Sequence, residues 1–305
     1  NFMKNPIAVF GSINMDLVVY SSTKPKDGET IFGKTFETFL GGKGANQAVA
    51  CSRLGSNVSF VGKVGNDLYG ELLREKLNSE NIDTELLGLH DGESGVALIN
   101  VVESTSQNQI IVVPGANSHT RSEQMSDQVL SSTDILISQM EVESKEIEKL
   151  FLRAKERNCY RILNVAPALT LSNSLFSETD LFVVNEIELE SLTKKSIQMD
   201  CLDSIKESIE SMSLNNQQSI VVTLGSNGVY IYQNNQYEFI ESHKVDAIDT
   251  TGSGDCFIGA LASCLSEKHD LLEAAVFANK AAAISVTKKG ASSSMPTTQE
   301  VLKFG

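Results

Sequence analysis

The stretch DTTGSGDCFIGALASCL at 249–265 combines a carboxylate with a loop that carries almost no side chains. Gly252, Ser253 and Gly254 precede Asp255, and an apolar run typical of a buried helix follows at once. The first N–H groups of a helix have no intrahelical partner, and with the helix dipole they bind negative charge. Asp255 alone is compatible with a plain helix cap. Glycines on both sides of Ser253 favour a second hypothesis, an anion hole for a phosphoryl group in transfer, with Asp255 as the proton acceptor.

The position of Asp255 also affects its strength as a base. A helix N-terminus lowers the pKa of a carboxyl group, so we expect Asp255 to be a weak base. In a loose phosphoryl-transfer transition state the hydroxyl proton leaves late, and a weak but well-placed base is then sufficient. The motif therefore indicates kinase chemistry that other parts of the chain must support.

A second glycine-rich segment, GGKGANQA at 41–48, also begins an apolar helical pattern. It is not a dinucleotide-binding fingerprint, because Gln47 stands where the last glycine belongs. Its glycines let a polar ligand approach the backbone, with Lys43 and Asn46 as hydrogen-bond donors. Taken alone, the segment is more typical of an ordinary glycine-rich connection.

The segment GETIFGKT at 28–35 matches the pattern of a nucleotide-binding P-loop, but its context does not. A P-loop follows a buried strand and opens a helix. Here turn-forming residues precede the match, and the alternating FETF follows it. We therefore expect a strand of a surface hairpin.

Short apolar runs alternate with amphipathic segments along most of the chain, which predicts an α/β fold with a mostly parallel sheet covered on both faces. The predicted strands are 6–13, 58–65, 134–138, 161–167, 181–186 and a strand–turn–strand at 219–232. The predicted helices are 44–55, 69–82, 144–158, one around 200–213, and an alanine-rich one within 271–290.

Two segments, 17–39 and 95–113, interrupt this alternation, because they are rich in β-branched residues with polar turns between them. Both are typical of antiparallel hairpins. We expect them to form a small sheet beside the main one. No internal repeat or linker is visible, so residues 1–305 are predicted to be one domain with a β-sheet lid.

Composition excludes several classes of function. The chain has 39 acidic and 25 basic residues and a formal net charge of −14, which argues against a nucleic-acid surface. Its five cysteines and four histidines show no disulfide or zinc spacing. No apolar run has the length of a membrane span and nothing resembles a signal peptide, so we expect a cytoplasmic protein.

Five motifs occur in the order found in the PfkB carbohydrate kinases, the ribokinase-like family. They are GSINMD at 11–16, GGKGANQA at 41–48, NEIE at 185–188, TLGSNG at 223–228 and DTTGSGD at 249–255. The resemblance covers nearly the whole chain, and the first two motifs are most similar to members that act on ribose. It implies a three-layer α/β sandwich with a small β-sheet lid.

The resemblance also implies which residues hold the sugar. A polyhydroxylated ring needs several paired donors and acceptors, and such a site rejects analogues that lack one hydroxyl. Glu141 is the implied acidic ligand after the strand at 134–138, with Glu143 as the less favoured alternative. The implied set is Asn14, Asp16, Gly42, Lys43, Asn46, Glu141 and Asp255.

For the nucleotide, the resemblance places Asn185 and Glu188 near the phosphates and Mg²⁺. It implies that Glu188 contacts Mg²⁺ through water, since Mg²⁺ keeps waters and few protein ligands. Without the resemblance, Glu188 would be interpreted as a solvated helix residue. Thr223, Gly225 and Gly228 are implied to border the nucleotide, with Asn279 beside the adenine.

Family members acting on ribose are activated by a monovalent cation beside the anion hole. Oxygen-rich coordination by carbonyl groups suits a large ion such as K⁺. The matching positions, several acting through backbone carbonyls, are Asp249, Thr251, Ser285, Lys288, Gly290 and Ser294.

The expected activity is ATP-dependent phosphorylation of D-ribose at its 5-hydroxyl, giving ribose 5-phosphate and ADP. Two alternatives stay open at this point: a kinase for another sugar or nucleoside, such as 2-deoxyribose, fructose or adenosine, and a sugar-binding protein without catalysis. Because lid hairpins expose sheet edges and apolar strand residues, we also expect a homodimer formed through the lid.

Overall fold

A computed structural model describes residues 6–103, 107–198 and 202–304 of the protein. Its main sheet has nine strands in the order β13-β12-β11-β10-β9-β8-β1-β4-β5, and all neighbours pair in parallel except β11–β12 and β12–β13. Short continuous apolar runs such as IAVF and LFVV form strands buried on both faces. The strands are β1 (Ile7–Phe10), β4 (Val58–Gly65), β5 (Leu87–His90), β8 (Ile135–Gln139), β9 (Tyr160–Asn164), β10 (Leu181–Asn185), β11 (Ser219–Thr223), β12 (Val229–Gln233) and β13 (Gln236–Ile240).

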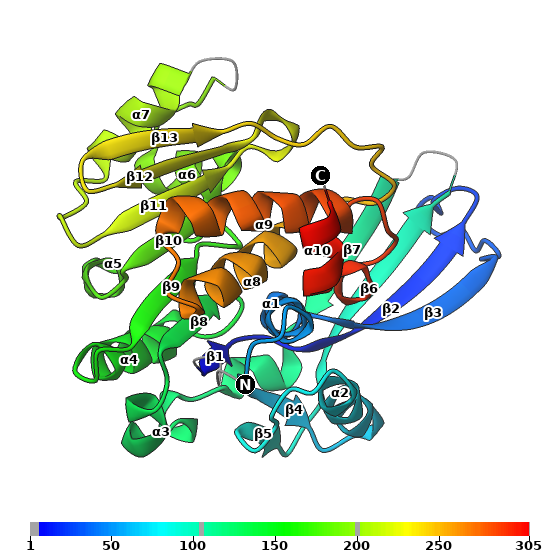
Figure 1. The fold of residues 1–305 in the computed structure, drawn as a ribbon. Helices are drawn as coiled ribbons and strands as arrows, with labels where there is room; N and C mark the ends of the chain where they lie inside the picture. The colour runs from blue at the N-terminus through cyan, green and yellow to red at the C-terminus, as the bar shows by residue number, and fades with distance from the viewer. Residues whose placement is uncertain (1–5, 104–106, 199–201, 305) are drawn as a thin grey trace.

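Helices cover both faces of this sheet and form two separate apolar cores (Figure 1). One core contains α1 (Lys43–Arg53), α2 (Leu68–Ser79), α8 (Ser253–Ser266), α9 (Leu271–Ser285) and α10 (Thr298–Lys303). The other contains α3 (Asp127–Ser131), α4 (Ser144–Lys155), α5 (Asn173–Ser177), α6 (Glu186–Thr193) and α7 (Leu202–Ser211). The predicted three-layer α/β fold is confirmed. Strand β13 is an addition that the sequence pattern did not indicate.

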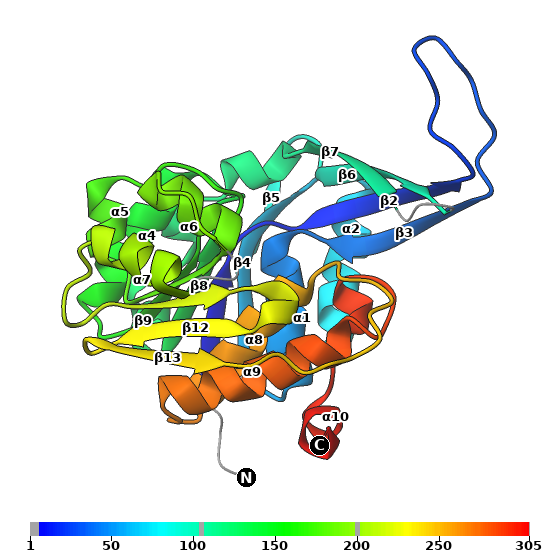
Figure 2. The ribbon, with the colours of Figure 1, turned by 90° about the horizontal axis from the view of Figure 1, so that it is seen from above.

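The second sheet has four strands in the order β3-β2-β6-β7, with β2 (Asn14–Ser21), β3 (Thr35–Gly41), β6 (Gly95–Val102) and β7 (Gln107–Val113). Both predicted hairpins are antiparallel, and they are joined by a parallel pairing of β2 with β6. Figure 2 shows the long loop between β2 and β3 extending from this sheet. We call the four strands and this loop the lid. Residues 104–106 of the predicted segment lie outside the described residues.

The P-loop-like segment at 28–35 lies almost entirely in that loop, and only Thr35 belongs to a strand. No helix follows it, so the segment has no phosphate-binding geometry. Its expected assignment to a hairpin strand is wrong for 28–34, because pairing with β2 begins only at the Tyr20–Thr35 pair. Residues 28–34 are exposed, except for the half-buried Ile31.

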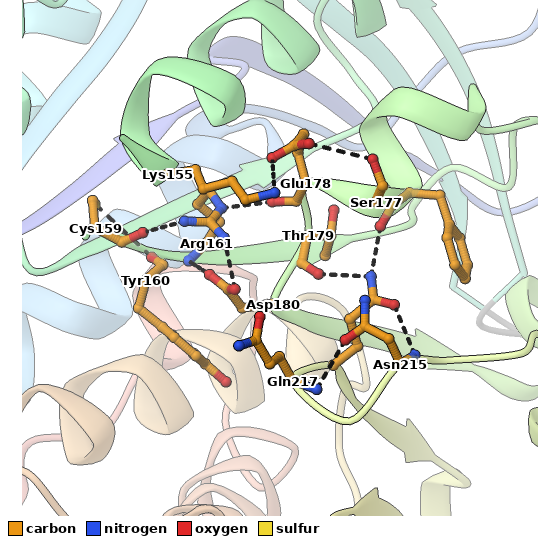
Figure 3. A network of polar contacts seen from close by, with 12 residues as sticks. Lys155, Cys159, Tyr160, Arg161, Ser177, Glu178, Thr179, Asp180, Asn215 and Gln217 are labelled. Atoms are coloured by element: carbon orange, nitrogen blue, oxygen red, sulfur yellow. Dashed lines mark hydrogen bonds and ion pairs between the residues drawn. The ribbon is translucent and has the colours of Figure 1, made fainter. Parts of the chain in front are cut away.

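The buried side chain of Arg161 ties β9 to β10 at the amino ends of these two strands (Figure 3). The Arg161 side chain donates to the Glu178 carbonyl at 2.6 Å and the Cys159 carbonyl at 2.8 Å, and it pairs with Asp180 at 2.7 Å. The Arg161 backbone N–H also donates to Asp180. This network satisfies the backbone carbonyls and the carboxylate that lie at the amino ends of these two strands.

Among the described residues, no helix is both long and apolar enough to cross a membrane. Cys51, Cys159 and Cys256 are free thiols in this part of the chain, and Cys201 lies outside the described residues.

Candidate active site

A cavity of about 200 Å³ opens at the carboxyl ends of β9, β10 and β11, beside the beginning of α8. Ligands of open parallel sheets bind at these strand ends. The structure brings predicted residues from four distant segments to this cavity. Its lining includes Lys43, Asn185, Glu188, Thr223, Gly252, Ser253, Gly254 and Asp255.

Helix α8 begins at Ser253, and no side chain caps it. Gly252 is the residue before the helix and has a φ of +74°, a conformation that favours glycine. A Cβ atom on Gly254 would meet no atom within 4 Å, so the helix start is open on that side. The Ser253 N–H already donates to the Thr250 carbonyl at 3.2 Å. The first-turn amides after Ser253 are therefore the ones available to an anion.

Asp255 is the third residue of α8, so the interpretation of its side chain as the helix N-cap is wrong. Its side chain is buried and accepts hydrogen bonds from Asn46 at 3.0 Å and Gln47 at 2.9 Å. Burial raises the pKa of Asp255, and the Lys43 charge with the two amide donors partly opposes that rise. The expectation of a lowered pKa is also wrong, because desolvation outweighs the Lys43 charge and the two amide hydrogen bonds.

Lys43, at the first position of α1, lies among three carboxylates. The charges of Asp255, Glu141 and Glu188 raise its pKa despite burial, so its ammonium group stays protonated. This single cation is placed between the predicted proton acceptor and the predicted phosphate-side glutamate. It can neutralise negative charge that gathers there.

The predicted sugar ligands Asn14 and Asp16 lie at the start of β2, where the lid meets the main sheet. A Cβ on Gly41 would come within 2.1 Å of the Asp16 carboxylate, so the first glycine of GGKGANQA allows this close approach. Burial, with the nearby charge of Glu141, raises the pKa of Asp16 to about 7. Two carboxyl groups therefore share one small region, a set of acceptors suited to sugar hydroxyl groups.

The structure separates the two candidate glutamates after β8. Glu141 accepts hydrogen bonds from the Ser12 hydroxyl and from the Lys43 backbone N–H, which places it at the start of α1 beside the GSINMD turn. Glu143 points elsewhere and pairs with Arg121 at 3.5 Å near the surface. Of the two, only Glu141 lies with the other predicted sugar ligands.

Asn185 and Glu188 form a reciprocal cap at the start of α6, each side chain accepting from the other's backbone N–H at 2.8 Å. Burial raises the pKa of Glu188, with the Lys43 charge opposing. Glu188 is therefore not the solvated helix residue that its sequence context alone suggests. Thr223 ends β11 beside them, and its hydroxyl donates to the Val184 carbonyl at 3.3 Å.

The three remaining predicted nucleotide residues lie outside the cavity lining. Gly225 and Gly228 are in the β11–β12 turn, and Asn279 is near the end of β13. Gly228 has a φ of +111°, and a Cβ there would come within 2.2 Å of the Ile240 carbonyl. Asn279 of α9 donates to the neighbouring Glu241 carbonyl at 2.9 Å. None of the three lines the cavity, so their place beside the nucleotide stays a prediction.

The predicted cation positions lie in two segments that meet behind Gly252. One is the loop before α8, with Asp249 and Thr251, and the other runs from Ser285, the last residue of α9, to Ser294 in a short 3-10 helix. Asp249 accepts from the Thr251 and Gly290 backbone N–H groups, both at 2.9 Å, and so ties the loops together. These bonds lower the pKa of Asp249. Ser285 and Ser294 are buried nearby, whereas the Lys288 side chain turns away to Glu300 at 2.6 Å. Across residues 6–103, 107–198 and 202–304, no three Asp, Glu, His or Cys side chains gather as metal ligands.

Sequence reasoning missed a set of buried amide side chains around the site. Asn117 donates to the Asn14 side chain at 2.7 Å and fixes its orientation. Gln47, Gln139 and Asn164 form a row behind Asp255. Gln47 falls inside the glycine-rich motif, which could have drawn attention to it. The others carry no local signal, because their partners come from distant segments.

A mostly parallel α/β sheet, with an uncapped helix start beside a buried carboxylate, defines a small-molecule phosphotransferase. The chain belongs to the pfkB family of carbohydrate kinases, whose model matches residues 4–298. It is 37% identical to the ribokinase of Haemophilus influenzae over 99% of both chains, and 35% identical to the deoxyribokinase of Salmonella typhi over 98% of both. The structure of Arabidopsis thaliana ribokinase complexed with ribose and ATP matches with a TM-score of 0.88, at 30% identity over 99% of both chains. The resemblance identified from the motifs is confirmed.

Proposed function

We propose that this carbohydrate kinase transfers the γ-phosphoryl group of ATP to the 5-hydroxyl of D-ribose. The observation that carries the proposal is the uncapped start of α8, open at Gly254, with the buried Asp255 carboxylate one residue further on. Two findings support this choice of substrates. The chain matches a relative named ribokinase over nearly its full length, and the similar Arabidopsis structure contains ribose and ATP.

The sugar is proposed to lie between the lid and α1. Asn14 and Asp16 come from β2, Asn46 from α1, and Glu141 from the segment after β8. Asn117 occupies the Asn14 side-chain oxygen, so the amide N–H₂ of Asn14 is the group left to donate to a sugar oxygen. The carboxyl groups of Asp16 and Glu141 accept from sugar hydroxyls.

In the transfer step, the sugar O5 forms a bond to the γ-phosphorus while the bond from that phosphorus to the ADP oxygen breaks. The proton of the 5-hydroxyl passes to Asp255. The raised pKa of Asp255 makes it a better proton acceptor than a free aspartate. First-turn amides of α8 and the Lys43 ammonium stabilise the charge on the equatorial phosphoryl oxygens.

Residues toward the nucleotide and ions are assigned by the same proposal. Asn185, Glu188, Thr223, Gly225, Gly228 and Asn279 border ATP. Glu188, a carboxylate in the cavity lining, fits Mg²⁺ held by few protein groups, and Mg²⁺ would neutralise phosphate charge. For K⁺, the proposal assigns the Asp249 carboxylate, which the Thr251 and Gly290 N–H groups hold in place, together with backbone carbonyls of the same two segments.

The substrate alternative with a specific observation behind it is 2-deoxyribose, because a deoxyribokinase relative is as similar as several ribokinases. The two sugars differ only in the 2-hydroxyl. A site that pairs that hydroxyl rejects the deoxy sugar strongly, since buried partners would be left unpaired. Comparing kcat/KM for the two sugars therefore decides between them.

The lid supports a proposal of self-association. One of its faces carries Val19, Phe36, Leu98 and Ile111, with exposures of 38%, 61%, 46% and 64%. Apolar side chains this exposed on a sheet usually meet a partner. We propose a homodimer through the lid. Sedimentation velocity at assay concentration, giving the 33.1 kDa monomer alone, would contradict it.

The decisive experiment is an ADP-release assay with ATP, Mg²⁺ and ribose, with and without K⁺, for the wild type and Asp255→Asn. We expect ribose-dependent ADP release that K⁺ increases and Asp255→Asn abolishes. Turnover of another sugar but not ribose would keep the kinase and reject the substrate. No turnover with any sugar, in protein that still binds ribose, would favour the non-catalytic alternative.

A further inference from the structure

Three buried amide side chains form a hydrogen-bonded row behind the Asp255 carboxylate. Gln47 of α1 donates through Nε2 to Asp255 Oδ1 at 2.9 Å and to Asn164 Oδ1 at 3.1 Å. Gln139, the last residue of β8, donates through Nε2 to Gln47 Oε1 at 2.6 Å. Gln47 and Gln139 are completely buried. The row therefore joins α1, β8 and β9 to the proposed proton acceptor.

The chemistry of the row permits one orientation of the Gln47 amide. An ionised carboxylate only accepts hydrogen bonds, so Gln47 must present its N–H₂ group to Asp255. Both hydrogens are then committed, to Asp255 and Asn164, and Asn164 is held in turn by donating to the Val183 carbonyl at 3.2 Å. Gln47 Oε1 consequently faces away from Asp255 and needs a donor, which Gln139 supplies.

Gln139 supplies this donor at an energetic disadvantage. The Oε1 atom of Gln139 is buried without a hydrogen-bond partner in the described structure. A Cβ atom on Gly11 would come within 2.1 Å of this oxygen. An unpaired buried acceptor destabilises a fold by about 1–3 kcal/mol. Rotating the Gln139 amide would instead set its oxygen against the oxygen of Gln47 and leave both unpaired. The observed orientation is therefore the one that keeps the Gln47 N–H₂ on Asp255.

We propose that Gln47 and Gln139 are positioning residues, Gln47 orienting the Asp255 carboxylate toward the attacking hydroxyl and Gln139 locking the Gln47 amide in its donating orientation. This inference rests on Asp255 being the proton acceptor of the proposed function. Gln47 donates to one Asp255 oxygen and Asn46 donates to the other, so the carboxylate cannot rotate freely. It extends the site by two groups that touch neither sugar nor nucleotide.

The row also influences when Asp255 is ionised. Its Gln47 and Asn46 donors and the Lys43 charge lower the pKa of Asp255, whereas burial and the Glu141 charge raise it. Glu188 on α6 and the Cys256 thiol next in the chain face the same carboxylate. If Gln139 is lost, Gln47 can turn its oxygen to Asp255. We then expect the pKa of Asp255 to rise and the acid limb of the kcat profile to move to higher pH.

The test compares Gln47→Met, Gln139→Met and the double variant, which keep side-chain length and remove the hydrogen bonds. We expect the acid limb of Gln139→Met to move up by about one pH unit, which is about tenfold in kcat below its midpoint. The KM for ribose should change less than about twofold. Because Gln139 acts through Gln47, the double variant should match Gln47→Met, a coupling that a double-mutant cycle measures.

The matched control is Gln218→Met, because Gln218 is a buried glutamine that donates to the Phe176 and Thr179 carbonyls away from the site. It should lower thermal stability without moving the pH profile. Gln139→Leu is a second variant, in case Gln139→Met does not fold. It also removes the donor to Gln47 Oε1, so it should move the acid limb in the same direction.

A readout without turnover separates this inference from the proposed function. The ¹³C resonance of the Asp255 carboxyl carbon, assigned by its loss in Asp255→Asn, reports its titration directly. We expect a higher titration midpoint in Gln47→Met and Gln139→Met than in the wild type. An unchanged midpoint and an unchanged acid limb in folded Gln139→Met overturn the inference. A shifted midpoint in protein that phosphorylates no sugar overturns the proposed function and keeps the row.

Discussion

Replacing Gly254 by alanine should separate the stability of the fold from its activity. Gly254 is the second residue of α8, and a Cβ there meets nothing within 4 Å, so the folded chain accepts the methyl group without strain. Alanine is favoured over glycine in a helix by roughly 0.5–1 kcal/mol. We therefore expect a free energy of unfolding that is unchanged or higher, and a Tm raised by about 2 °C.

The open space beside Gly254 is, by our proposal, where the phosphoryl group passes. A methyl group in that space keeps the phosphoryl oxygens away from the first-turn amides of α8. Loss of one such donor lowers kcat by about 10²–10³-fold in enzymes that use oxyanion holes. The assay is ADP release at saturating ribose and ATP, with calorimetric ribose binding as the control. Ribose binding should change little, since the proposed sugar ligands other than Asp255 lie on β2, around the start of α1 and in the segment after β8.

A kcat within about threefold of wild type, in Gly254→Ala protein with an unchanged or raised Tm, refutes this reasoning. In that case the α8 amides do not receive the transferring group, and the open space at Gly254 has no role in transfer. A lowered Tm would instead show that the space is filled in solution by part of the chain.

Three further predictions concern other parts of the molecule. The pKa of Asp16 is raised from 3.8 to about 7, so between these pH values the native state holds a proton that the unfolded state has lost. The stability that this group contributes therefore falls as the pH rises from about 4 to 7. Urea midpoints of the wild type and Asp16→Asn across that range test this prediction. Sugar hydroxyls donate to the carboxylate, so ribose binding should weaken about tenfold per pH unit well below 7, and Asp16→Asn should abolish that slope. Arg161→Met leaves the partly buried Asp180 without its cation and should lower the free energy of unfolding by about 3–5 kcal/mol. The value of kcat should stay within about twofold, because the network lies at the amino ends of β9 and β10, and a proportional loss of kcat in folded protein would contradict this.

Much of the architecture followed from local patterns in the sequence. Alternating apolar and amphipathic segments predicted the parallel sheet and its helices, because strands buried on both faces need continuous apolar runs. The β-branched hairpins predicted the lid. Motif order predicted the family, and glycines around Ser253 predicted an exposed helix start. These features depend on residue type and spacing within short windows.

Tertiary structure decided what depends on distant neighbours. The raised pKa of Asp255, opposite to the expected direction, comes from burial against α1, which no local pattern reports. The choice of Glu141 over Glu143 depends on where the Ser12 turn and the start of α1 meet β8. The amide row of Gln47, Gln139 and Asn164 exists only because α1, β8 and β9 converge behind Asp255. Desolvation and hydrogen bonding act over a few ångströms in space, so the sequence supplies the groups and the fold assigns their partners.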